Sequence, residues 1–248
     1  MISIIICSIN PVSFTRVCAN YRSLLGAEPY EVIGIHDAKG LAEAYNRGLA
    51  QSKGDIVIFC HDDIEIWTPE FLPRLKHHLQ TFDVIGVAGT SRLVGAGWHS
   101  AGPPYIFGQI THPLKGDFHV GFYGGQGNAA VGGIQAMDGV FLAFKRNVIQ
   151  HVGWDAENFK GFHCYDIDCT YRAHKLGYKL GVVLDLPMFH VSGGNFGDTW
   201  KAHAAIFLQK HGATLSTAPW VTFRDAFTQV ATREQALELM HRYAKLPS

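Results

Sequence analysis

The chain has 248 residues, of which 47% are hydrophobic and 17% charged, a balance that excludes a disordered protein and allows a sizeable buried core. Lysine plus arginine and aspartate plus glutamate number 21 each, so neither a nucleic-acid partner nor an acidic membrane surface is indicated. A chain of this length suits one large α/β domain or two small ones.

The first 90 residues alternate between short apolar runs and amphipathic runs. Strands are predicted at residues 2–7, 31–35, 56–60 and 84–88. Helices are predicted from Ser13 to about residue 25, over residues 41–51, and after Thr68-Pro69-Glu70, which reads as a helix start. Strands that alternate with helices predict an α/β fold, a mainly parallel, Rossmann-like sheet with helices on both faces.

The pattern changes at residues 89–137, which are rich in glycine and aromatic residues and show no helical period. We predict a flap or acceptor-binding insertion there, because so long a connection without regular structure is unusual unless it serves a site. A rigid β-hairpin whose aromatic side chains fill a small core is the alternative.

Regular elements are predicted again beyond that insertion. A strand at 140–144, a helix at 166–176, a strand at 180–184, a helix from Asp198 to about 211 and a weaker helix at 234–243 follow. The expected organisation is one domain over residues 1–215, with a helical C-terminal extension over residues 216–248.

The expected compartment is the cytoplasm, with peripheral attachment at the inner membrane face left open. The five cysteines form no CxxC pair, and residues 1–9 lack the basic region and cleavage site of a signal peptide. No window approaches the ~20 apolar residues of a membrane span, so no transmembrane segment is predicted.

Three polar residues, His61-Asp62-Asp63, follow the buried run at residues 56–60. Ligands of open α/β sheets bind at the carboxyl ends of the strands, where these side chains would lie. Adjacent carboxylates offer hard oxygen ligands to Mg²⁺ or Mn²⁺, and a metal held there can bind a diphosphate. The alternative is an ordinary acidic turn before a helix.

Four segments in a fixed order resemble the GT-A glycosyltransferases of family 2. They are ISIIICSIN, GLAEAYNRGLAQSKGDIVIFCHDDIEI, MDGVFLAFKRNVI and GFHCYDIDCTYRAHKLGYKLGVV, and the likeness spans about residues 1–210. The best match is the subgroup with a His-Asp-Asp metal motif and a His-x-Tyr-Asp-x-Asp acidic segment, which includes streptomycin-pathway-related proteins. Two departures from the wider family stand out: His61 begins the metal motif, and Tyr165 replaces the glutamate before Asp166.

The resemblance implies a site for a divalent cation, Mn²⁺ or Mg²⁺. Asp63 is the expected anchor, Asp62 a second ligand or a ribose contact, and His190 a third metal ligand. For His190 the alternative is a histidine whose hydrogen bonds are satisfied inside a glycine-rich loop.

The resemblance also implies a catalytic base and a donor site. Asp166 is the expected base, whereas Asp168 is as well explained as a first-turn acid of a helix. The residues expected to bind the nucleotide sugar are Ser8, Asn10, Asp37, Asn46, Asp62, Asp138 and Gly139. For Asp138-Gly139 the alternative is a simple turn.

The function that follows is a metal-dependent glycosyltransferase, expected to be inverting. The donor would be a nucleoside diphosphate sugar, with UDP favoured, and the acceptor a glycan, a lipid-linked molecule or a small molecule. The alternative is a non-catalytic domain of the same fold that binds a sugar nucleotide or a partner. A nucleotidyltransferase or phosphohydrolase is disfavoured, because SINPVSF is not a basic, glycine-rich phosphate loop.

Overall fold

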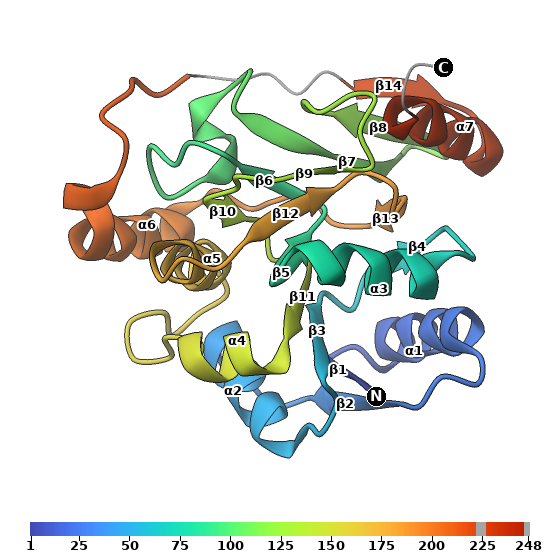
Figure 1. Cartoon of the computed structure of the whole chain (residues 1–248), viewed down its shortest axis with the longest axis horizontal. Helices are drawn as coiled ribbons and strands as arrows, with labels where there is room; N and C mark the ends of the chain where they lie inside the picture. The colour runs from blue at the N-terminus through green and yellow to red at the C-terminus, as the bar shows by residue number, and fades with distance from the viewer. Residues whose placement is uncertain (222–226, 246–248) are drawn as a thin grey trace.

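The computed structural model describes residues 1–221 and 227–245 and contains a large mixed sheet (Figure 1). In spatial order its strands are β2 (Tyr30–Ile35), β1 (Ile2–Cys7), β3 (Ile56–Cys60), β11 (Phe141–Lys145), β5 (Val84–Gly86), β12 (Leu180–Val183) and β9 (Ala130–Val131). The pairs β1–β2 and β1–β3 are parallel, whereas β11 runs antiparallel to both β3 and β5. The predicted α/β class is confirmed, but the sheet is mixed rather than mainly parallel.

Helices cover both faces of this sheet. One face carries α1 (Pro11–Leu25) and α3 (Phe71–Thr81), and the other carries α2 (Leu41–Gln51), α4 (Arg146–Val152), α5 (Tyr165–Lys175) and α6 (Asp198–His211). Strand β1 shows why both faces need a covering of helices. Its side chains alternate, so that Ile4 and Ile6 pack beneath α1 while Ile5 packs beneath α2. A strand buried on both faces must be apolar at every position, and each such side chain contributes about 1.5–3 kcal/mol on burial.

A second sheet occupies the upper part of Figure 1, beside β12 and β9 of the first sheet. Its order is β10 (Ala136–Met137), β6 (Ala88–Thr90), β7 (Ile106–Leu114), β13 (Met188–His190) and β4 (Ile64–Ile66), and β8 (Asp117–Phe122) pairs with β7 and with β14 (Phe227–Val230). A small core of Trp67, Val120, Ala236 and Met240 fixes α7 (Arg233–Ala244) against it. Two 3₁₀ helices, η1 (Trp98–Ala101) and η2 (Gly212–Thr214), complete the described elements.

Several local predictions differ from the structure. The predicted strand at 84–88 is two strands, since β5 joins the first sheet and β6 the second. Helix α1 is capped by Asn10 and not by Ser13: the Asn10 side chain accepts the backbone N–H groups of Val12 and Ser13 at 2.9 and 3.3 Å. The C-terminal segment holds β14 as well as the expected helix.

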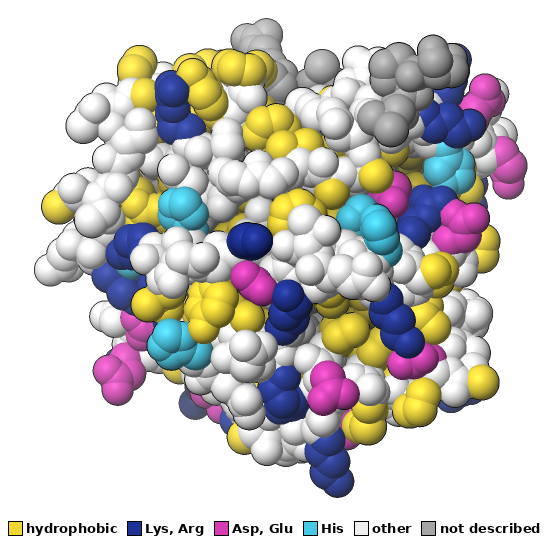
Figure 2. Space-filling view, in the orientation of Figure 1, with side chains coloured by type: hydrophobic (Ala, Val, Ile, Leu, Met, Phe, Trp, Pro, Cys, Tyr) yellow, Lys and Arg dark blue, Asp and Glu magenta, His cyan; other side chains and the backbone are white. Residues whose placement is uncertain are grey.

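The surface carries no obvious charge segregation on the face drawn in Figure 2, where basic and acidic side chains are interspersed. Such a surface accords with the neutral formal charge of the sequence. Within residues 1–221 and 227–245, no helix has the length and apolar character needed to cross a membrane.

Candidate metal and sugar-nucleotide site

The loops after β1 and β3 lie at one edge of the first sheet, because the two strands are parallel. The start of β11 reaches the same edge, since that strand is antiparallel, and the His61 backbone N–H donates to the Val140 carbonyl at 3.1 Å. Strand β13 pairs with β4 in the register His190 opposite Ile64, which brings His190 to the same place. Side chains from four distant segments therefore meet at this edge.

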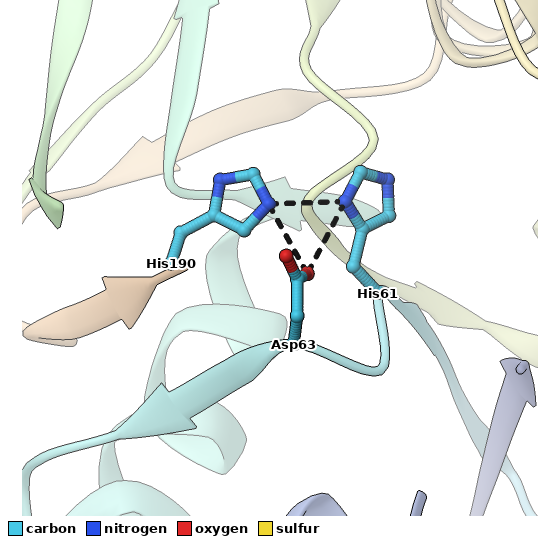
Figure 3. A group of neighbouring side chains, drawn as sticks. All are labelled: His61, Asp63 and His190. Atoms are coloured by element: carbon cyan, nitrogen blue, oxygen red, sulfur yellow. Dashed lines mark hydrogen bonds and ion pairs between the residues drawn. The ribbon is translucent and has the colours of Figure 1, made fainter. Parts of the chain in front are cut away.

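His61, Asp63 and His190 form a compact cluster there (Figure 3). His61 Nδ1 lies 3.2 Å from His190 Nε2, and Asp63 Oδ1 lies 3.3 Å from His190 Nε2 and 4.0 Å from His61 Nδ1. Ligand atoms about 2.0–2.2 Å from a common ion lie roughly 3–4 Å apart, so the three atoms match the spacing of a chelating set.

Backbone contacts hold Asp63 in place for this role. The Ser192 N–H donates to Asp63 Oδ2 at 2.9 Å, and the Val191 N–H donates to the Asp63 carbonyl at 3.1 Å. These bonds join the loop after β3 to the loop after β13. They occupy one carboxylate oxygen and leave the other, Oδ1, directed at the two imidazoles.

The protonation states in the cluster suit a cation. Burial alone would raise the pKa of Asp63, but hydrogen bonds from His190 and Ser192 outweigh burial and hold that pKa well below its usual range. Burial, with the neighbouring His190 second, lowers the pKa of His61. Near neutral pH the cluster therefore contains an ionised Asp63 carboxylate and a neutral His61.

The donor set of two imidazoles and one carboxylate fits Mn²⁺ better than Mg²⁺. Magnesium prefers oxygen ligands and retains its waters, whereas manganese accepts carboxylate and imidazole ligands together. Zinc and ferrous iron share that preference. The sequence-based expectation named Asp63 and His190, and the structure brings both into the cluster; His61 is the member that it missed.

Asp62 lies outside this cluster. Its Oδ2 accepts a hydrogen bond from Ser8 Oγ at 2.5 Å, which ties the loop after β3 to the loop after β1. Both residues remain at the sheet edge expected of a donor-binding loop. Asp62 and Asp63 lie in a turn between β3 and β4, and their side chains take different partners, Ser8 for Asp62 and His190 with Ser192 for Asp63.

Three other expected donor-binding residues have structural partners. Asn10 caps α1. Asp37 is exposed and forms an ion pair with Arg47 at 2.9 Å. Asn46 is bonded twice to the backbone of Trp154, donating from Nδ2 to its carbonyl at 2.8 Å and accepting its N–H at 3.2 Å. These contacts account for the three side chains without a ligand.

Asp138, Gly139 and Asp166 come together beside the cluster. The Gly139 N–H donates to Asp166 Oδ2 at 2.7 Å, and Trp98 Nε1 donates to Asp138 Oδ2 at 2.9 Å. Burial first, and the charge of Asp138 second, raise the pKa of Asp166 from 3.8 to about 7. Glycine is required at 139 because a Cβ there would lie 2.3 Å from the Tyr165 hydroxyl.

A cavity of about 130 Å³ has a polar lining that includes Asp138, Asp166 and one member of the metal cluster, His61. Its aromatic lining includes Trp98, Phe162, Tyr165, Phe196 and Trp200. Phe162 and Phe196 are about half exposed, so the cavity opens to solvent between aromatic faces. A cation site, a titratable carboxyl group and flat apolar surfaces are thus adjacent.

Asp168 does not face this cavity. It is fully buried and accepts hydrogen bonds from Arg172 at 2.8 Å, Lys210 at 2.6 Å and His211 at 2.7 Å. Arg172 belongs to α5, and Lys210 and His211 belong to α6. Asp168 therefore has a structural role, because its carboxylate connects these two helices.

Most aromatic residues of the 89–137 insertion serve packing. Phe118 and Phe122 belong to the small core beneath α7, and Tyr105 stacks under the Arg92 guanidinium at 3.5 Å. Trp98 lines the cavity. Strands β7 and β8 form the hairpin that the sequence left as the alternative to a flap.

Comparison with known proteins places the fold. A model of the family described as "Glycosyltransferase like family" matches residues 3–235. The mannosyltransferase PcManGT from Pyrobaculum calidifontis, solved with GDP-Man and Mn²⁺, aligns with a TM-score of 0.50 and 13% identity, over 98% of this chain and 68% of that one. GalNAc-T7, solved with UDP, GalNAc and Mn²⁺, aligns with a TM-score of 0.50 and 12% identity, over 84% of this chain and 47% of that one. No curated protein matches by sequence.

Proposed function

Because the chain belongs to the glycosyltransferase-like family, we propose that it transfers a sugar from a nucleoside diphosphate sugar to an acceptor hydroxyl in a metal-dependent reaction. The observation that carries the proposal is the His61–Asp63–His190 cluster beside a cavity that contains Asp166. A chelating set next to a titratable carboxyl group supplies the two functions that such a transfer needs.

His61 Nδ1, His190 Nε2 and Asp63 Oδ1 would hold the cation. When bound, a divalent cation supplies positive charge for the negative charge that develops on a departing diphosphate. The Ser192 N–H keeps Asp63 oriented, and Ser8 keeps the loop carrying Asp62 against the loop after β1. The protein thus presents the donor-binding loops as one connected surface.

Asp166 is the proposed base. A base works best when its pKa lies near the operating pH, and burial beside Asp138 raises the pKa of Asp166 to about 7. Its Oδ2 accepts the Gly139 N–H, which fixes the carboxyl group at the cavity wall. Proton removal by one carboxylate on the acceptor side accords with an inverting reaction.

UDP is the favoured nucleotide of the donor, and Mn²⁺ the favoured cation. The two structural neighbours were solved with Mn²⁺ and with GDP-Man or UDP, which supports testing both nucleotides. Residues 1–215 would form the catalytic domain, with the insertion at 89–137 supplying Trp98 to the cavity and residues 216–248 acting as an extension.

A thermal-shift panel of UDP- and GDP-linked sugars, each with and without Mn²⁺, tests this function. We expect one donor to raise the melting temperature only when Mn²⁺ is present. Asp63→Asn should abolish that shift, whereas Asp55→Asn, an exposed aspartate at the other end of β3, should leave it intact. Donor binding that is equally metal-dependent in Asp63→Asn would overturn the assignment. Binding without any transfer in an acceptor screen would favour the non-catalytic alternative.

A further inference from the structure

The second ring nitrogen of His61 has a defined partner. While Nδ1 faces His190 and Asp63, Nε2 lies 3.3 Å from the Tyr165 hydroxyl. Tyr165 is 3% exposed and is the first residue of α5, immediately before Asp166. A neutral imidazole that offers one nitrogen to a cation carries its proton on the other, and that proton needs an acceptor.

The hydroxyl of Tyr165 is arranged to be that acceptor. It shares a hydrogen bond with the hydroxyl of Tyr45. The Tyr45 hydroxyl in turn donates to the Cys60 carbonyl at 3.3 Å. A backbone carbonyl can only accept, so the chain of bonds has one direction, from His61 through Tyr165 and Tyr45 to Cys60.

We propose that Tyr165 is a positioning residue of the cation site, holding His61 in the Nε2–H form with the Nδ1 lone pair directed at the cation. This inference rests on the proposed function, since it assumes that the cluster binds a metal. It also links the two departures from the family pattern, because His61 and Tyr165 are in contact.

The surroundings of the two tyrosines make the arrangement rigid. Tyr45 is fully buried, and its ring lies 5.8 Å from Tyr165 and 5.1 Å from Trp154. Gly139 provides the space for the Tyr165 hydroxyl, because a Cβ at 139 would lie 2.3 Å from it. Fixed partners of this kind typically account for about 10–100-fold in metal affinity.

Titration of the metal-free protein with Mn²⁺ in a calorimeter, without nucleotide, measures this contribution. Tyr165→Phe removes only the hydroxyl and should weaken Mn²⁺ binding about 10–100-fold. Tyr171→Phe is the matched control, since Tyr171 is a buried tyrosine on the same helix whose hydroxyl donates to the Thr214 carbonyl, away from the cluster. Affinity within about twofold of wild type in Tyr165→Phe would overturn the proposal.

A second measurement needs no metal. Long-range ¹H–¹⁵N NMR spectra distinguish the two imidazole tautomers, and His61→Gln identifies the His61 signals by their loss. We expect the Nε2–H form in the wild type and a mixture of tautomers in Tyr165→Phe. An unchanged Nε2–H form in that variant would overturn the positioning role. A wild-type protein that binds no Mn²⁺ would instead overturn the proposed function, so the two failures are distinguishable.

Discussion

Asp166→Asn should stabilise the folded protein at alkaline pH, an outcome opposite to that of most substitutions at a buried polar position. The folded-state pKa of Asp166 is raised from 3.8 to about 7 by burial and by Asp138. The folded protein therefore binds more protons than the unfolded chain between these values, and its stability falls as the pH rises from about 4 to about 7. Asparagine cannot ionise, and its side-chain oxygen can still accept the Gly139 N–H.

The size of the effect follows from the shift. About three pKa units correspond to ~4 kcal/mol at 1.36 kcal/mol each. Asp166 borders a cavity that opens to solvent, which screens its charge, so we expect ~1–3 kcal/mol at pH 8. At about pH 3, below both pKa values, the wild-type carboxyl group is largely protonated in both states, and the two proteins should have nearly equal stability.

Urea denaturation of both metal-free proteins at about pH 3 and at about pH 8, one below and one above the titrating range, tests this prediction. Asp155→Asn is the control of opposite sign, because hydrogen bonds from Lys210 and Asn158 outweigh burial and lower the pKa of Asp155 to about 2. It should destabilise the protein at pH 8. An Asp166→Asn protein that is less stable than wild type at pH 8, or whose stability difference is the same at both pH values, would refute the reasoning.

Three further predictions concern the site and its surroundings. Asp168→Asn should lower the free energy of unfolding by ~1.5–3 kcal/mol, because it removes the charge of a fully buried carboxylate that accepts hydrogen bonds from Arg172 and Lys210; chemical denaturation measures it, and a loss below ~1 kcal/mol would contradict the structural role. Asp166→Asn should preserve donor binding but reduce turnover by ~10²–10⁴-fold with a confirmed acceptor, and a loss of less than tenfold would identify another base. The backbone amides of β7 and β8 should be protected from hydrogen exchange without ligand, and donor plus Mn²⁺ should leave this protection unchanged. Protection that appears only with donor would support a mobile flap instead of a rigid hairpin.

The elements that the sequence predicts well depend on local chemistry. The helix at Leu41–Gln51 and the strand at Ile56–Cys60 were predicted with the bounds that they have, since each is an unbroken pattern with clear breakers at its ends. The sequence predicts the start of α1 at Ser13 rather than after Asn10, because asparagine and serine are both favourable N-cap residues. The direction in which the chain enters the helix decides which of the two caps it.

The composition of the metal cluster depends on pairings that no local pattern contains. His61 and His190 are 129 positions apart and meet because β13 pairs with β4. The sequence suggested Asp62 beside Asp63, since adjacent carboxylates are a familiar signal. The turn after β3 instead brings His61 and Asp63 to His190 and Asp62 to Ser8, a division that depends on long-range pairing.

The most direct test of the account is pulsed electron paramagnetic resonance of Mn²⁺ bound to the wild-type protein, which detects nitrogen ligands of the ion. We predict coupling to two imidazole nitrogens, reduced to one in His61→Gln and in His190→Gln, with cation affinity strongly weakened in Asp63→Asn. Bound Mn²⁺ that shows no nitrogen coupling in the wild-type protein would contradict the claim that His61, Asp63 and His190 form the metal site.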